Sequence, residues 1–173
     1  MFMTIDALRL TGDPRFADAL EHALLNAMAG SQHPSGEWWT YMTQMDGRKY
    51  PSWVSINFQS RPATPELNCC SVNGPNSLAC LSNWALMQTD DALVVNFYAP
   101  FKADVVLSSG DEITLIQNTD YPVSGNIEIS IKGADGTSIP LWLRIPKWAE
   151  KADIKLNGEK VALSPSGRYA EIT

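Results

Sequence analysis

In the segment DDALVVNFY, residues 90–98, the spacing of the apolar residues changes from one period to another. Before it, four apolar residues recur at every fourth position, as in an amphipathic helix: Phe16, Leu20, Leu24 and Met28. After it, apolar residues alternate with polar ones in short runs between turn residues, which is typical of β-strands. The sequence therefore predicts an α+β chain, helical over residues 1–91 and β over residues 92–173.

Two helices are predicted before the change of period. For the first, at residues 14–29, Asp13 is a typical N-cap, Pro14 suits the first helical position, and Gly30 stands where a C′ glycine would end the helix. His22 lies among its polar residues and is predicted to be on the surface. The second helix is predicted from residue 74 to residue 87, with three apolar residues on one face: Leu78, Leu81 and Ala85.

Six strands are predicted after it, at residues 93–98, 103–107, 112–117, 126–132, 140–145 and 153–156. Turn signals separate them, among them Asn157-Gly158, a dipeptide that favours tight hairpins. Short strands joined by such turns are expected to pair antiparallel, and we predict an antiparallel β-sandwich. In this sandwich Trp142 and Trp148 are predicted to be core and edge residues.

Residues 31–66 form a long stretch rich in aromatic residues and interrupted by four prolines. A structureless loop of this length is uncommon, so the stretch is either a functional loop or contains short strands. Its aromatic residues include Trp38, Trp39, Trp53 and Phe58. Two interpretations stay open: the rings line a carbohydrate site, or they cover the core.

Charge excludes some classes of partner. The chain has 173 residues, 13 of them basic and 19 acidic, which gives a formal net charge of −6. Because no run of Lys and Arg is present to neutralise phosphates, nucleic acid is excluded as a partner. No apolar run approaches the roughly 20 residues that cross a bilayer, so no membrane association is predicted.

The three cysteines are too few and too clustered for a disulfide framework, which favours a reducing, cytoplasmic compartment. The first six residues lack the pattern of a signal peptide. Both ends nevertheless look cut: the helices cannot bury their apolar faces alone, and residues 169–173 read as the middle of a strand. We therefore expect a fragment of a larger protein, and secretion stays open.

Cys69 and Cys70 are the main candidates for chemistry. Both precede the predicted helix N-terminus, where the helix dipole favours a thiolate, and this suits a nucleophile or a ligand of zinc. Glu66 or Cys80 could join such a site, but two adjacent cysteines cannot complete a tetrahedral shell. The alternative is that the cysteines are core residues, and we predict this for Cys80 because it lies beside apolar helix positions.

Several segments, in this order, resemble the β-L-arabinofuranosidases of glycoside hydrolase family 127. They are TGDPRFAD at residues 11–18, NCC at residues 68–70 with NGPN at residues 73–76, LVVNFY at residues 93–98, and LWLRIPKW at residues 141–148. The resemblance implies the C-terminal helices of an (α/α)6-barrel catalytic domain over residues 1–91, followed by a β-sandwich domain, truncated at its C-terminus, over residues 92–173.

The resemblance also implies roles for the cysteine pair. Cys69 would be the nucleophile of a retaining reaction, and Cys69 and Cys70 would both bind zinc. The other zinc ligands and the acid/base glutamate belong to family segments upstream of those matched, and Cys80 is not the family's third cysteine. The resemblance thus implies part of a β-L-arabinofuranosidase-like glycoside hydrolase that acts on an arabinofuranoside-containing glycan and is inactive as an isolated chain. A homodimer is a compatible assembly.

Two rival functions predict different behaviour. A non-catalytic carbohydrate-binding or scaffold module would bind sugars through its sandwich and aromatic residues, and Cys69→Ser would not matter. A thiol redox protein would use the adjacent cysteines, with thiols that react readily at neutral pH and without dependence on sugar.

Overall fold

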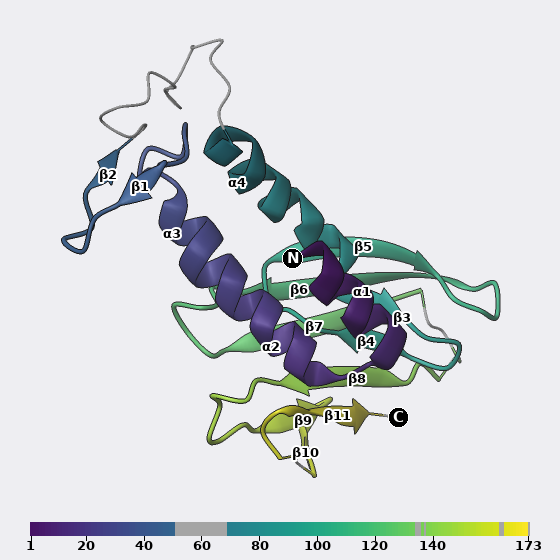
Figure 1. Cartoon of the computed structure of the whole chain (residues 1–173). Coiled ribbons are helices and arrows are strands. Elements are labelled where there is room, and N and C mark those ends of the chain that lie inside the picture. Colours follow the sequence, from purple (N-terminus) through teal and green to yellow (C-terminus); the bar gives the residue numbers. More distant parts are fainter. Residues whose placement is uncertain (51–68, 134–135, 137, 163–164, 173) are drawn as a thin grey trace.

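A computed structural model describes residues 1–50, 69–133, 136, 138–162 and 165–172 (Figure 1). Helices and short strands alternate in the first half, and strands fill the second half. Within the described residues, no helix is long and apolar enough to cross a membrane. The helical elements are α1 (Phe2–Thr11), α2 (Pro14–His22), η1 (Ala23–Met28), α3 (Ala29–Ser31), α4 (Cys69–Ala79) and η2 (Cys80–Asn83).

The predicted first helix is confirmed as the continuous run α2–η1–α3. The backbone N–H of Arg15 donates to Oδ1 of Asp13 at 2.9 Å, and Pro14 takes the first helical position. The prediction that Gly30 ends the helix is wrong by two residues, because helical backbone continues to Ser31 and Gln32 is the C-cap. The middle segment, η1, is wound as a π-helix.

The second helix differs from its prediction at both ends. The described helix α4 runs from Cys69, so the two cysteines lie in its first described turn and do not precede the helix. Pro75 is an interior residue, although proline favours the first turn. The helix α4 contacts η1, and tertiary packing of this kind can override a local signal. At the other end, the strand formed by residues 86–88 takes the place of the last two residues of the predicted helix, 86 and 87.

The remaining elements in the described part of the chain are strands, and they form two larger sheets and two hairpins. β1 (Met42–Thr43) pairs with β2 (Lys49–Tyr50), so the aromatic stretch contains short strands. One larger sheet has the order β11-β8-β4-β3 and the other the order β5-β6-β7. Their strands are β3 (Leu86–Gln88), β4 (Leu93–Val95), β5 (Phe101–Val106), β6 (Glu112–Thr119), β7 (Ile127–Lys132), β8 (Leu141–Ile145) and β11 (Arg168–Ile172).

Among the strands that the structure describes, the pairing is antiparallel with one exception, which corrects the prediction of an antiparallel β part. β4 and β8 run parallel, with Val94 opposite Trp142. Parallel neighbours need a long crossover connection, and here the three strands of the second sheet supply it. The predicted hairpin at Asn157-Gly158 is confirmed between β9 (Ile154–Leu156) and β10 (Glu159–Val161), because both turn residues have positive φ.

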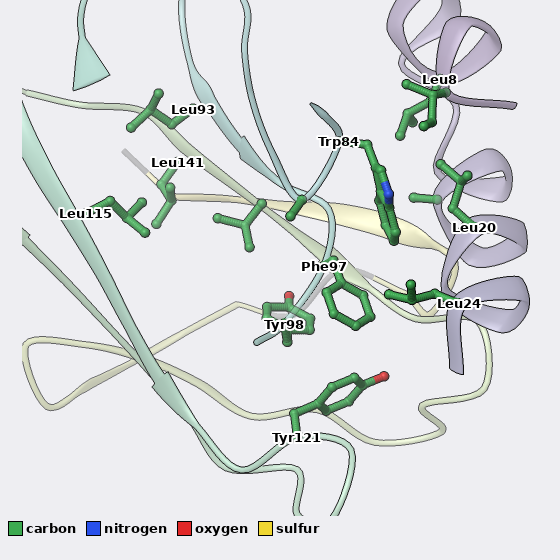
Figure 2. Packing of buried hydrophobic residues seen from close by; sticks show 14 of the residues in the cluster. Leu8, Leu20, Leu24, Trp84, Leu93, Phe97, Tyr98, Leu115, Tyr121 and Leu141 are labelled. Carbon is green, nitrogen blue, oxygen red and sulfur yellow. The ribbon is translucent and has the colours of Figure 1, made fainter. Parts of the chain in front are cut away.

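A single hydrophobic core joins the helices to both sheets. Trp84 is fully buried and follows η2, and its ring lies 5.3 Å from that of Phe97. Figure 2 shows Leu20 and Leu24 of the helices facing these two rings. The second sheet contributes Leu115, which is also fully buried. The helical and β parts are therefore packed as one unit.

Candidate functional site

Two thiols meet in the first described turn of α4. The Sγ atoms of Cys69 and Cys70 lie 3.6 Å apart, within hydrogen-bond distance, and the two are not joined by a disulfide. Cys69 is exposed, whereas Cys70 is half-buried. This turn lies at the end of the molecule away from β8 and β11 (Figure 1). An exposed thiol next to a second thiol can attack a substrate or bind a soft metal ion.

Burial keeps Cys70 protonated when no metal is bound. Desolvation, followed by the hydrogen bond to Cys69, raises the pKa of the Cys70 thiol to about 11. At neutral pH it is therefore a neutral thiol and not a nucleophile. A bound cation would reverse this, because thiol ligands of a metal ion are deprotonated.

Packing against the aromatic stretch holds α4 in place. The indole ring of Trp39 lies against Gly74, at a distance that would not admit even a methyl group on Gly74. Asn73 supports the first turn, because its Nδ2 donates to the carbonyl oxygen of Cys69 at 2.7 Å. The cysteine pair is thus carried on a helix that is fixed by side-chain packing and by its own hydrogen bonds.

The two thiols fit a zinc ion, although they do not complete its coordination. Two sulfurs at about 2.3 Å from one tetrahedral zinc lie roughly 3.8 Å apart, close to the 3.6 Å between Cys69 and Cys70. Among the described residues there is no cluster of three or more His, Cys, Asp or Glu side chains. Glu66, a candidate third ligand, lies outside the described residues.

Other predicted residues have varied positions. Cys80 is 5% exposed and belongs to the core, and His22 is exposed, as predicted. Trp38 stacks on His33 with ring centroids 4.3 Å apart. Trp53 and Phe58 lie outside the described residues. Trp148, predicted in the core or at an edge, is 62% exposed.

A buried ionic cluster that was not predicted from the sequence joins α2 to β8. Arg144 is fully buried, and its guanidinium donates to carboxylate oxygens of Asp18 and Glu21. Its Nε donates to the carbonyl oxygen of Asn96 at 2.6 Å, and the Trp148 indole N–H donates to Oε1 of Glu21 at 2.8 Å. The available signal was an arginine inside the otherwise apolar run LWLRI, since a buried charge needs a partner.

Two family models match the chain, one for each half. The model described as "Beta-L-arabinofuranosidase, GH127 catalytic domain" matches residues 1–83. The model described as "Beta-L-arabinofuranosidase, GH127 middle domain" matches residues 92–173. No match was found among curated protein sequences.

Solved structures share the fold. A GH127 beta-L-arabinofuranosidase from Geobacillus stearothermophilus is 27% identical, with a TM-score of 0.76 over 99% of this chain and 28% of that chain. A protein described as a glycoside hydrolase is 24% identical, with a TM-score of 0.74 over 96% of this chain and 28% of that chain. A GH127 beta-arabinofuranosidase is 22% identical, with a TM-score of 0.74 over 99% of this chain and 28% of that chain.

Proposed function

Since the chain belongs to the β-L-arabinofuranosidase family, glycoside hydrolase family 127, we propose that it is part of a retaining glycoside hydrolase in which Cys69 is the nucleophile. The chain spans 28% of the length of the similar structures, so the activity is proposed for the whole enzyme. The observation that carries the proposal is the exposed Cys69 thiol, 3.6 Å from Cys70, in the half that matches the catalytic domain.

In the proposed reaction the Cys69 sulfur attacks the anomeric carbon of a β-L-arabinofuranoside. A carbon–sulfur bond forms while the bond to the leaving oxygen breaks, and a general acid gives that oxygen its proton. Water then attacks the anomeric carbon and gives a proton to the same acid/base group, while the carbon–sulfur bond breaks and returns the Cys69 thiolate. We propose Cys69 and Cys70 as zinc ligands, and zinc, when bound, keeps a thiol deprotonated at neutral pH.

We further propose that residues 1–173 alone do not catalyse hydrolysis. The family resemblance assigns the acid/base glutamate and the remaining zinc ligands to other segments. General acid–base catalysis contributes typically about 10²–10⁴-fold to rate, and a site with two protein ligands binds zinc weakly. A nitrophenyl β-L-arabinofuranoside assay is expected to give no release, and release that is abolished by Cys69→Ala would contradict the proposed inactivity.

The architecture we propose for the whole enzyme follows from the same membership. The helices α1 to α4 would be the last helices of an (α/α)6 barrel, and the two larger sheets would be part of a β-sandwich. The shared core between these sheets supports the second assignment.

Zinc binding tests the proposed ligands separately from hydrolysis. We expect the purified chain to bind zinc weakly, as measured by equilibrium dialysis over a range of zinc concentrations, and Cys69→Ala and Cys70→Ala to weaken binding at least about tenfold each. Cys80→Ala is the matched control, because this thiol is buried in the core and should leave zinc affinity unchanged. No zinc binding by the unaltered chain, or equal affinity in all three variants, would contradict the assignment.

A further inference from the structure

Two aromatic residues on β8 and β11 lie next to cavities that are separate from the cysteine pair. Trp142 and Tyr169 form an aromatic pair there, with ring centroids 6.3 Å apart and ring planes at 40°. Two cavities, of ≈ 320 Å³ and ≈ 780 Å³, are both lined by these two residues, so the pair forms a wall common to both. Their volumes are in the range of ligand pockets, roughly 300–1,000 Å³.

The aromatic pair is held rigidly. The Tyr169 hydroxyl donates to Oδ1 of Asn96 at 2.5 Å, and Asn96 is fully buried. Tyr169 is paired with Arg144 across the sheet, and Trp142 lies between Val94 and Glu171 in register. Both residues are nevertheless partly exposed. A fixed, partly exposed aromatic surface can stack on a ligand without losing much conformational freedom.

The charges of the larger cavity balance. Three acidic and three basic side chains line it: Asp13, Asp18, Glu171, Arg15, Lys147 and Arg168. Asp13 is paired with Arg15, and Asp18 with buried Arg144. Among the described residues, Lys147, Arg168 and Glu171 form no side-chain ion pair. They therefore offer hydrogen-bond donors and an acceptor around the rings without a large net charge.

We propose that the two cavities walled by Trp142 and Tyr169 form one groove that binds a neutral glycan. This groove is a different site from the cysteine pair. A sugar ring has an apolar face that can stack on Trp142 or Tyr169, and hydroxyl groups that donate to carboxylates and accept from ammonium or guanidinium groups. The balanced charge disfavours a phosphate or a polyanion. The choice of arabinan as a probe rests on the proposed function, whereas the stacking site itself does not.

Native gel electrophoresis with soluble polysaccharide in the gel tests the proposal on the full chain. We expect arabinan or a soluble β-glucan to retard the unaltered chain, and Trp142→Ala to weaken this retention at least about tenfold. Arg168→Ala with Glu171→Ala is a second variant, which should also weaken retention. Because both side chains are exposed, their removal should not cause the misfolding that Trp142→Ala could. The matched control, Lys160→Ala with Glu159→Ala, changes exposed charges on β10 and should behave as the unaltered chain.

Every other outcome would contradict the proposed glycan binding. Absence of retardation by both neutral glycans, retardation only by a polyanion such as heparin, or retention equal in all variants would do so. Retention lost in Cys69→Ala would place sugar binding at the cysteine pair instead. Occupation of the groove by a second copy would appear as a Trp142-dependent dimer without glycan binding, and would also contradict the proposal. Failure of zinc binding would leave the glycan result unchanged, so the two proposals fail separately.

Discussion

Arg144 on β8 and Glu21 on α2 form a buried ion pair across 123 residues of sequence. Asp18, one helical turn before Glu21, accepts from the same guanidinium. The pair joins the half matched by the catalytic-domain model to the half matched by the middle-domain model. Because the carboxylates and the guanidinium come from different halves, neither half can satisfy its buried charges alone.

Replacing Arg144 with methionine should destabilise the protein strongly. The substitution leaves the carboxylates of Glu21 and Asp18 without their cation, and breaking a buried pair costs about 3–5 kcal/mol. Urea unfolding followed by circular dichroism measures the loss. Arg9→Met is the matched control: Arg9 is exposed and pairs with exposed Asp6 at 3.6 Å, so its loss should cost less than about 1 kcal/mol.

The coupling energy between Glu21 and Arg144 distinguishes the loss of their ion pair from the loss of packing. In a double-mutant cycle, Glu21→Gln with Arg144→Met should cost clearly less than the sum of the single variants. Additive losses, or an Arg144→Met variant as stable as Arg9→Met, would contradict the view that this pair fastens the halves together.

Local chemistry explains which features could be predicted from the sequence. The start of α2 is encoded by Asp13 and Pro14, because capping depends on neighbouring residues only. The burial of Glu21 could not be predicted, since helical spacing does not reveal a partner on a distant strand. The helical position of the cysteines could not be predicted either. Gly74 and Pro75 indicated a later helix start, but α4 includes both cysteines and contacts η1 and Trp39, which are distant in sequence.

Substituting Gly74 with alanine should destabilise the helix that carries the cysteines. A methyl group there would overlap the indole ring of Trp39, so the ring or α4 must move. We expect a lower midpoint of thermal unfolding than in the unaltered chain. The control is Gly30→Ala in α3, where a methyl group meets nothing within 4 Å and the higher helix propensity of alanine should stabilise by about 0.5–1 kcal/mol. Equal effects of the two substitutions would rule out close packing at Gly74.

Thiol labelling should distinguish the cysteine pair from the core cysteine. Cys69 is exposed and Cys70 half-buried, whereas Cys80 is 5% exposed. In the chelator-treated native protein we expect a disulfide reagent to label Cys69, and Cys80 to react only after denaturant is added. Peptide mapping of the labelled chain identifies the sites. Labelling of Cys80 in the native protein at the rate of Cys69 would contradict its burial in the core.

Alkaline pH should remove the stabilising contribution of Tyr169. Burial raises the pKa of its hydroxyl from an ordinary value near 10 to about 12. Since the folded state holds this proton more tightly, the contribution is complete below about pH 10 and is lost as the pH rises to about 12. Tyr169→Phe deprives buried Asn96 of a hydrogen bond and should cost roughly 1 kcal/mol at neutral pH. The difference in unfolding free energy between the two proteins should therefore shrink above pH 10, whereas a constant difference up to pH 12 would show that the hydroxyl titrates as in the unfolded chain.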